Sequence, residues 1–266
     1  MNYWTKVSTE FANQRNYLDE LYKVYPITPN LRREISRDKE ENIRNAFISG
    51  NNIDLIKQLL DLELFPIKDS YVAYLKRDRN AIERNPQTIN RIAGNLYQMG
   101  FDQIIEKCTE PKETNRQIGP MFKQWIDKGT LGVPIFKKEL DFLNCNENCV
   151  YNVSDAEMKN FAKKYLGFER EKGIDFIAKF NNKYIIAEAK FITDFGGHQN
   201  AQFDDAVRTM QSDFSNKIVE NEVIPIAIMD GVLFIKGNNK LYTYIKNHDN
   251  QIIISSLLLR EFLFSL

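Results

Sequence analysis

Residues that commonly hold zinc are scarce in this chain. It has three cysteines, Cys108, Cys145 and Cys149, and two histidines, His198 and His248. Cys145 and Cys149 lie in the stretch CNENC, but a zinc site takes about four ligands. We therefore expect ordinary reduced thiols rather than a zinc site or a disulfide framework.

Long apolar runs and nucleotide-binding loops are also absent. No run approaches the roughly 18 apolar residues that a membrane-spanning helix needs. The first residues, MNYWTKVSTEF, lack the apolar segment of a secretory signal. No G-x-x-x-x-G-K-[ST] loop occurs, which argues against a P-loop NTPase. Lys plus Arg and Asp plus Glu number 36 each, so the net charge indicates no class of partner. We expect a globular cytoplasmic protein without a membrane partner.

Helical patterns fill the first half of the chain. Apolar residues recur at helical spacing in residues 51–65 and 88–108, with Gly100 interrupting the second stretch. Residues 115–129 indicate a loop followed by a short helix. Residues 154–168 predict a helix with Ser154 as its N-cap and Glu157 completing a capping box.

The rest of the chain predicts a sheet. Strands are expected at residues 173–190, folded as a hairpin, and at residues 222–231, 232–237, 240–246 and 251–258, with a helix over roughly residues 200–220. The fold class is therefore α/β or α+β: a mixed central sheet flanked by helices, with a mainly helical N-terminal region.

The hairpin places charged residues among apolar ones. Asn181-Asn182 suits a two-residue turn, because Asn tolerates positive φ. Phe180 then pairs with Lys183, and the same register sets Asp175 opposite Glu188. One face of the hairpin is wholly apolar: Ile174, Phe176, Ala178, Phe180, Ile185, Ala187, Ala189 and Phe191. The other face carries Asp175, Glu188 and Lys190 at one end.

Like charges that face each other across strands are destabilising. Either a cation between Asp175 and Glu188 or the ammonium group of Lys190 would remove that cost. Mg²⁺ suits a site of one or two carboxylates completed by water and phosphate oxygens, and Lys190 could position or deprotonate a water. This arrangement indicates metal-assisted hydrolysis of a phosphodiester. The alternative is a surface ion cluster that contributes little stability.

An Asp followed by a hairpin and Glu-x-Lys resembles the PD-(D/E)XK nuclease superfamily. The residues are Asp175 and Glu188-Ala189-Lys190, with Ile174 where the superfamily usually has proline. The resemblance spans about residues 150–240 and implies an αβββαβ core, although one early strand of that core has no counterpart in the sequence pattern.

The resemblance also implies roles for these residues. Asp175, Glu188 and the backbone carbonyl of Ala189 would bind one or two Mg²⁺ ions, and Lys190 would orient the attacking water. Glu157 is a candidate for a further acid from the preceding helix, and capping explains it equally well. Residues 131–266 would then be the catalytic core, and residues 1–130 a mainly helical region that contacts DNA.

Polar residues beside this motif are candidates for DNA binding. Some follow the second hairpin strand, namely His198, Gln199, Asn200 and Gln202; others, namely Arg116, Gln117 and Lys123, lie in residues 115–129. Asn and Gln can pair with adenine, and most protein–DNA hydrogen bonds reach phosphates. The alternatives are a polar loop with Asn200 as a helix cap, and solvated charges. The basic stretch 76–91 could likewise contact phosphates or form a solvated charged face. We place Asp204 and Asp205 in the first turn of the helix expected over roughly residues 200–220.

The general organisation is most similar to a type II restriction endonuclease. That resemblance implies double-stranded DNA as substrate, a homodimer, and a cognate DNA methyltransferase as a functional partner. A structure-specific or repair nuclease of the same superfamily is an alternative. Another is a non-catalytic DNA-binding module that retains the fold.

Overall fold

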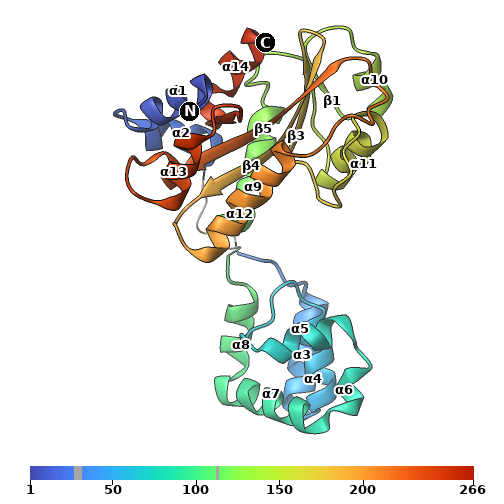
Figure 1. Cartoon of the computed structure of the whole chain (residues 1–266). Helices are drawn as coiled ribbons and strands as arrows, with labels where there is room; N and C mark the ends of the chain where they lie inside the picture. Colours follow the sequence, from blue (N-terminus) through green and yellow to red (C-terminus); the bar gives the residue numbers. More distant parts are fainter. Residues whose placement is uncertain (27–31, 112–113) are drawn as a thin grey trace. The chain divides into compact units, whose positions relative to one another are not determined.

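The structure of the chain is a computed structural model. It describes the backbone of residues 1–26, 32–111 and 114–266, and side chains throughout these ranges except at 114–116. The chain divides into two units, one made of Met1–Ile27 with Thr114–Leu266 and the other of Thr28–Glu113 (Figure 1). This division differs from the expected boundary near residue 130. Two N-terminal helices and the helix before residue 130 belong with the sheet, because their apolar side chains pack against it.

The first unit contains a six-stranded sheet among its described residues, in the order β1-β2-β3-β4-β5-β6. The strands are β1 (Ile135–Phe136), β2 (Cys149–Tyr151), β3 (Phe176–Phe180), β4 (Lys183–Ile192), β5 (Glu222–Gly231) and β6 (Ile253–Ile254). Strand β3 is antiparallel to β2 and to β4, whereas β1–β2, β4–β5 and β5–β6 are parallel. The sheet is therefore mixed, as the sequence predicts.

Helices cover both faces of this sheet (Figure 1). They are α1 (Tyr3–Ala12), α2 (Tyr17–Val24), α9 (Thr114–Asp127), α10 (Glu139–Asn144), α11 (Asp155–Tyr165), α12 (Gly197–Met210), α13 (Lys240–Asn247) and α14 (Leu259–Ser265), with 3-10 turns η1 (Val232–Phe234) and η2 (Ser256–Leu258). Helices α2, α9 and α14 pack on one face, α10 and α11 on the other face over β2 to β4, and α12 and α13 near β5 and β6. Because both faces are covered, residues on either side of β3 and β4 are buried.

The second unit is helical throughout its described residues. Its helices are α3 (Arg37–Ile48), α4 (Asn52–Leu60), α5 (Ser70–Arg77), α6 (Ala81–Arg84), α7 (Pro86–Met99) and α8 (Phe101–Cys108). They enclose their own core, in which Leu55, Ile56, Ile92 and Ile104 are fully buried. Gly100, at φ 84°, separates α7 from α8 as expected. In the described part of the chain no helix has the length and apolar character needed to cross a bilayer.

The expected hairpin register is confirmed from Phe176 to Phe180, but the expected pairing of Asp175 with Glu188 is not formed, because the Asp175 N–H bonds to the Ala187 carbonyl oxygen instead. Asn181 and Asn182 have φ of 48° and 61°, and Phe180 pairs with Lys183 and Phe176 with Ala187. The face that starts at Phe176 lies in one core cluster, as expected. Ile174 is an exception: it precedes the first paired residue and packs in the core on the opposite face.

Several expected elements at the C-terminal end are wrong. Residues 232–237 form no strand but begin with η1, and residues 240–246 lie in helix α13. Residues 251–258 contain only the short strand β6, followed by η2. At Gly231, φ is 96° and an added Cβ would lie 2.1 Å from the carbonyl oxygen of Ile192. A strand therefore cannot continue unchanged through this point, and the chain turns.

Two helices also have different bounds from those expected. Helix α9 begins at Thr114, so residues 115–127 are helical rather than a loop and a short helix. Helix α12 begins at Gly197 with Gly196 as its N-cap and ends at Met210. Asn200 is therefore not the cap, and Asp204 and Asp205 lie in the middle of the helix rather than in its first turn.

Candidate active site

The start of β3 carries Asp175 into the first unit's interior. The Asp175 backbone N–H donates to the carbonyl oxygen of Ala187 at 3.2 Å, one residue off the register of β3 and β4, in which Asp175 would face Glu188. Two residues earlier, an added Cβ at Gly173 would lie 2.8 Å from the Cβ of Asp155 on α11. A glycine at 173 thus allows α11 and the start of the strand to approach closely.

Asp175, Glu188 and Lys190 lie together. The Lys190 Nζ atom is 2.6 Å from Asp175 Oδ2 and 3.3 Å from Glu188 Oε2. Asp175 Oδ2 also accepts a hydrogen bond of 2.9 Å from the Ala189 N–H. The Glu188 side chain is 0% exposed, and those of Asp175 and Lys190 are 16% and 20% exposed. These values argue against an exposed hairpin with a surface ion cluster, because Glu188 is fully buried and Asp175 is largely covered.

Residues that the sequence analysis did not select complete the site. Lys172 Nζ lies 3.3 Å from Glu188 Oε2 and also contacts Asp205. Arg170 Nη1 lies 3.9 Å from Glu188 Oε1. Together these groups form what we call the Glu188 cluster: Arg170, Lys172, Asp175, Glu188, Lys190 and Asp205. It contains three carboxylates and three cationic groups.

A buried hydroxyl fixes one oxygen of Glu188. Thr209, on α12, donates a hydrogen bond to Glu188 Oε1 and accepts one of 2.6 Å from Arg170 Nη1. Thr209 is fully buried. Arg170 and Lys172 lie close to Asp175 in sequence. Thr209, in contrast, reaches Arg170 and Glu188 only because α12 packs on the sheet.

The pKa values of Asp175 and Lys190 are both raised. Burial raises the pKa of Asp175, and the Lys190 charge and the Ala189 N–H offset only part of this effect. Burial works to lower the pKa of Lys190, but the charges of Asp175 and Glu188 outweigh it and raise that pKa. Lys190 therefore stays protonated at neutral pH and acts as a hydrogen-bond donor.

The donor set fits a hard divalent cation. Glu188 Oε2 is buried and lies 3.3 Å from each of two ammonium groups, those of Lys172 and Lys190, without a well-formed hydrogen bond to the described residues. The described residues contain no group of three or more His, Cys, Asp or Glu side chains that could hold a metal. Two carboxylates completed by carbonyl, water and phosphate oxygens are a coordination typical of Mg²⁺.

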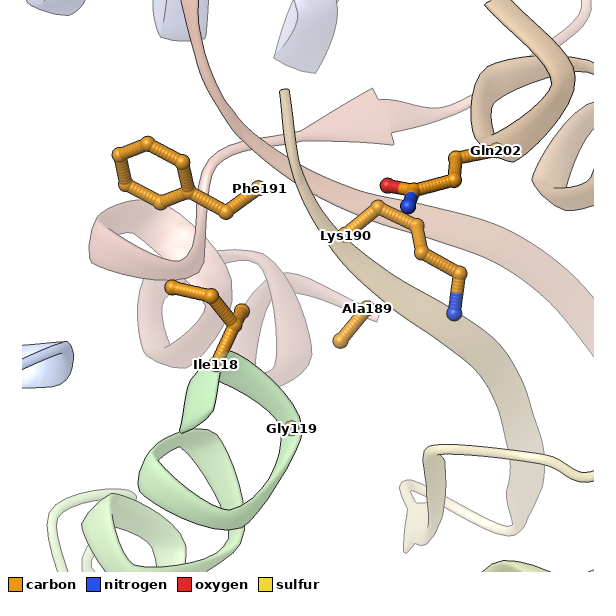
Figure 2. A pocket seen from close by; sticks show the side chains of 6 residues that line it. All are labelled: Ile118, Gly119, Ala189, Lys190, Phe191 and Gln202. Atoms are coloured by element: carbon orange, nitrogen blue, oxygen red, sulfur yellow. The ribbon is translucent and has the colours of Figure 1, made fainter. Parts of the chain in front are cut away.

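A cavity of about 210 Å³ lies beside Lys190. Figure 2 shows Lys190 and Gln202 along one side and Ile118 and Phe191 along the other. Gly119 of α9 and Ala189 complete the lining. Of the predicted DNA-contacting residues, Gln202 thus lies next to the candidate catalytic lysine.

The other predicted DNA-contacting residues of α12 have local partners. Gln199 is buried, and its side-chain oxygen accepts a hydrogen bond from the Thr193 N–H at 3.2 Å. Asn200 donates to the carbonyl oxygen of Phe195 at 3.2 Å. His198 is exposed, and its Nε2 lies 3.2 Å from Gln202 Nε2. His198 and Gln202 are therefore better placed for a ligand than Gln199.

Among the candidates on α9 and α11, Lys123 and Glu157 also have partners within the protein. Lys123 donates to the carbonyl oxygen of Val153 at 2.6 Å and lies 2.5 Å from Asp155. Glu157 completes the predicted capping box with Ser154. Gln117 is partly buried, whereas the side chain of Arg116 lies outside the described residues.

Most cations of the basic stretch 76–91 have partners within the second unit. Arg79, Arg84 and Arg91 pair with Asp61, Asp78 and Asp69, respectively, and Lys76 donates to the carbonyl oxygen of Leu62. These pairs favour the solvated-face interpretation for this stretch over phosphate contact.

Comparison with known proteins identifies a family for this chain. The family model described as Tsp45I type II restriction enzyme matches residues 2–266. No curated protein and no solved structure matches the chain.

Proposed function

Since this chain belongs to the Tsp45I type II restriction enzyme family, and is thus an endonuclease that binds double-stranded DNA, we propose that Asp175, Glu188 and Lys190 form its active site. There it hydrolyses a phosphodiester bond within a short specific sequence, in a reaction that depends on Mg²⁺. The observation that carries this proposal is the convergence of Asp175 and Glu188 on one ammonium group, that of Lys190.

In this site, Asp175, Glu188 and the carbonyl of Ala189 would hold one or two Mg²⁺ ions. Bound Mg²⁺ polarises phosphate oxygens and lowers the pKa of a coordinated water. The raised pKa of Lys190 favours a role in positioning the water or the phosphate over a role as general base. Thr209 and Arg170 would keep Glu188 oriented.

The same proposal assigns the chain to the PD-(D/E)XK superfamily. Four features support this assignment: the hairpin register, the Glu-Ala-Lys triplet, helix α12 after the hairpin, and strand β5 parallel to β4. Strand β2 lies beside β3 and supplies the early strand that the sequence pattern lacked, although it precedes α11 in the chain. We further propose a homodimer, because two-fold symmetry matches a palindromic site, and a cognate DNA methyltransferase as functional partner.

Cleavage of phage DNA tests this function. The purified protein with Mg²⁺ should yield discrete fragments whose sequenced ends share one short motif, and EDTA should abolish the cleavage. Asp175→Asn and Glu188→Gln should each lower the rate by at least about 1,000-fold, because both remove a metal-binding charge.

The matched control is Glu171→Gln. Glu171 is exposed and pairs with Lys159 and Lys163, so its loss should leave cleavage unchanged. Cleavage only at junctions or flaps would instead indicate a structure-specific nuclease. Full activity of both active-site variants would disprove the site assignment.

A further inference from the structure

Lys172 and Lys190 differ from Arg170, the third cation of the Glu188 cluster, in their partners. Arg170 is held by neutral groups as well as by acids, namely the Thr209 hydroxyl at 2.6 Å and the Asp205 carbonyl oxygen at 3.1 Å. Among the described residues, the contacts of the Lys172 ammonium are with two carboxylates, those of Glu188 and Asp205. Its side chain is 29% exposed and lies in the loop between α11 and β3. Lys172, like Lys190, is therefore held by carboxylates alone, and its side chain is the more exposed of the two lysines.

Two ammonium groups compete for the same oxygen atom. Lys172 Nζ and Lys190 Nζ each lie 3.3 Å from Glu188 Oε2. A divalent ion that uses this oxygen would repel both ammonium groups and weaken their attraction to Glu188. Lys190 would still be paired with Asp175, at 2.6 Å, and Lys172 with Asp205. Asp205 has a pKa lowered mainly by its hydrogen bond to Lys172, so it remains ionised and holds the lysine within the site.

We propose that Lys172 is a second functional ammonium of this site: it competes with Mg²⁺ for Glu188 and contacts the scissile phosphodiester when DNA is bound. The inference rests on the proposed function. A partly exposed ammonium on a flexible stem suits a phosphate as a point charge. Asp205 is then a positioning residue, because it acts through Lys172.

Metal binding in the absence of DNA tests the competition. Mn²⁺, which accepts the same oxygen ligands, is titrated into the full-length protein by calorimetry. Lys172→Met should bind Mn²⁺ about tenfold more tightly than wild type, or about 1.4 kcal/mol, because one competing charge is gone. Lys172→Arg keeps the charge and should bind like wild type. A weaker affinity in Lys172→Met would overturn the proposal, since it would mean that Lys172 merely holds Glu188 in place.

A neutral phosphate analogue tests the contact with DNA. Once the cut position is mapped, a methylphosphonate at the scissile position removes the charge that Lys172 would meet. Wild type should lose about tenfold in DNA affinity, and Lys172→Met should lose little. An equal loss in both proteins would refute the contact.

The matched control for both measurements is Lys163→Met. The Lys163 side chain is 32% exposed and pairs with an acid, Glu171, outside the Glu188 cluster. This variant should behave as wild type in both assays.

Cleavage by wild type separates the two proposals. If wild type cuts no DNA with Mg²⁺, the proposed function fails. If it cuts, but Lys172→Met changes neither Mn²⁺ affinity nor the methylphosphonate effect, the role of Lys172 alone is refuted.

Discussion

Replacing Thr209 by valine tests how the fold prepares Glu188 for a metal ion. The two side chains have nearly the same shape, so the buried site keeps its packing and loses only a hydroxyl. That hydroxyl donates to Glu188 Oε1. A hydrogen bond to a charged group contributes about 1.5–3 kcal/mol to stability. Arg170 retains the Asp205 carbonyl oxygen at 3.1 Å, so we expect Thr209→Val to lower the free energy of unfolding by about 2 kcal/mol.

The substitution should also weaken metal binding. Without the hydroxyl, Glu188 Oε1 keeps only Arg170, at 3.9 Å, and the carboxylate can rotate away from the orientation that directs Oε2 toward the metal. Loss of a group that orients a metal ligand typically costs 10- to 100-fold in affinity. We therefore expect Mn²⁺ affinity to fall at least about tenfold.

Urea unfolding and Mn²⁺ calorimetry on the same preparations measure the two effects. The control is Thr209→Ser, which retains the hydroxyl and loses one methyl group. It should cost about 1 kcal/mol of stability but bind Mn²⁺ as wild type does. If Thr209→Val binds Mn²⁺ normally, the hydroxyl does not orient Glu188, and the reasoning is refuted.

Three further predictions concern Glu157, Asp230 and Asn182. Glu157→Ala should lower stability by up to about 1 kcal/mol through loss of the capping box yet leave cleavage intact; a large loss of cleavage would indicate a metal ligand instead. Burial raises the pKa of Asp230, so wild type should lose stability as pH rises above the ordinary carboxyl range and through the folded-state pKa. Asp230→Asn should lack this slope in urea unfolding, and parallel pH profiles would contradict it. Asn182 has φ of 61°, so Asn182→Ala should cost about 1 kcal/mol whereas Asn182→Gly should cost little; equal costs would exclude backbone strain as the cause.

Local patterns were enough to predict the hairpin but not the elements after β5. The Asn-Asn turn and the alternation of side chains fixed the register of β3 and β4. Residues 240–246 alternate like a strand, yet Leu241 and Ile245 are also spaced for one face of a helix, and that face is buried. Asn239 caps this helix by accepting from the Tyr242 N–H. A stretch of seven residues can satisfy both the two-residue repeat of a strand and the 3.6-residue repeat of a helix, so packing in the first unit's core decides between strand and helix.

The site was predictable only where one hairpin builds it. Asp175 directly precedes β3, and Glu188 and Lys190 lie on β4, so the predicted hairpin brings the three residues close together. Asp205 and Thr209 reach the same site from α12, and their positions depend on how that helix docks on the sheet. No periodicity in the sequence encodes that docking. The predicted start of the helix, Asn200, lies three residues after its actual start at Gly197, so Asp205 was assigned to the wrong turn.

The balance of charges in the Glu188 cluster links metal binding to DNA binding. Three carboxylates and three cations compensate each other there, so by itself the cluster offers a phosphate little net attraction. A divalent ion held by Asp175 and Glu188 would leave the same groups with an excess of positive charge. A phosphodiester would then restore the balance, most directly beside Lys190 and Lys172. At such a site, each ligand would raise the affinity for the other by the same factor.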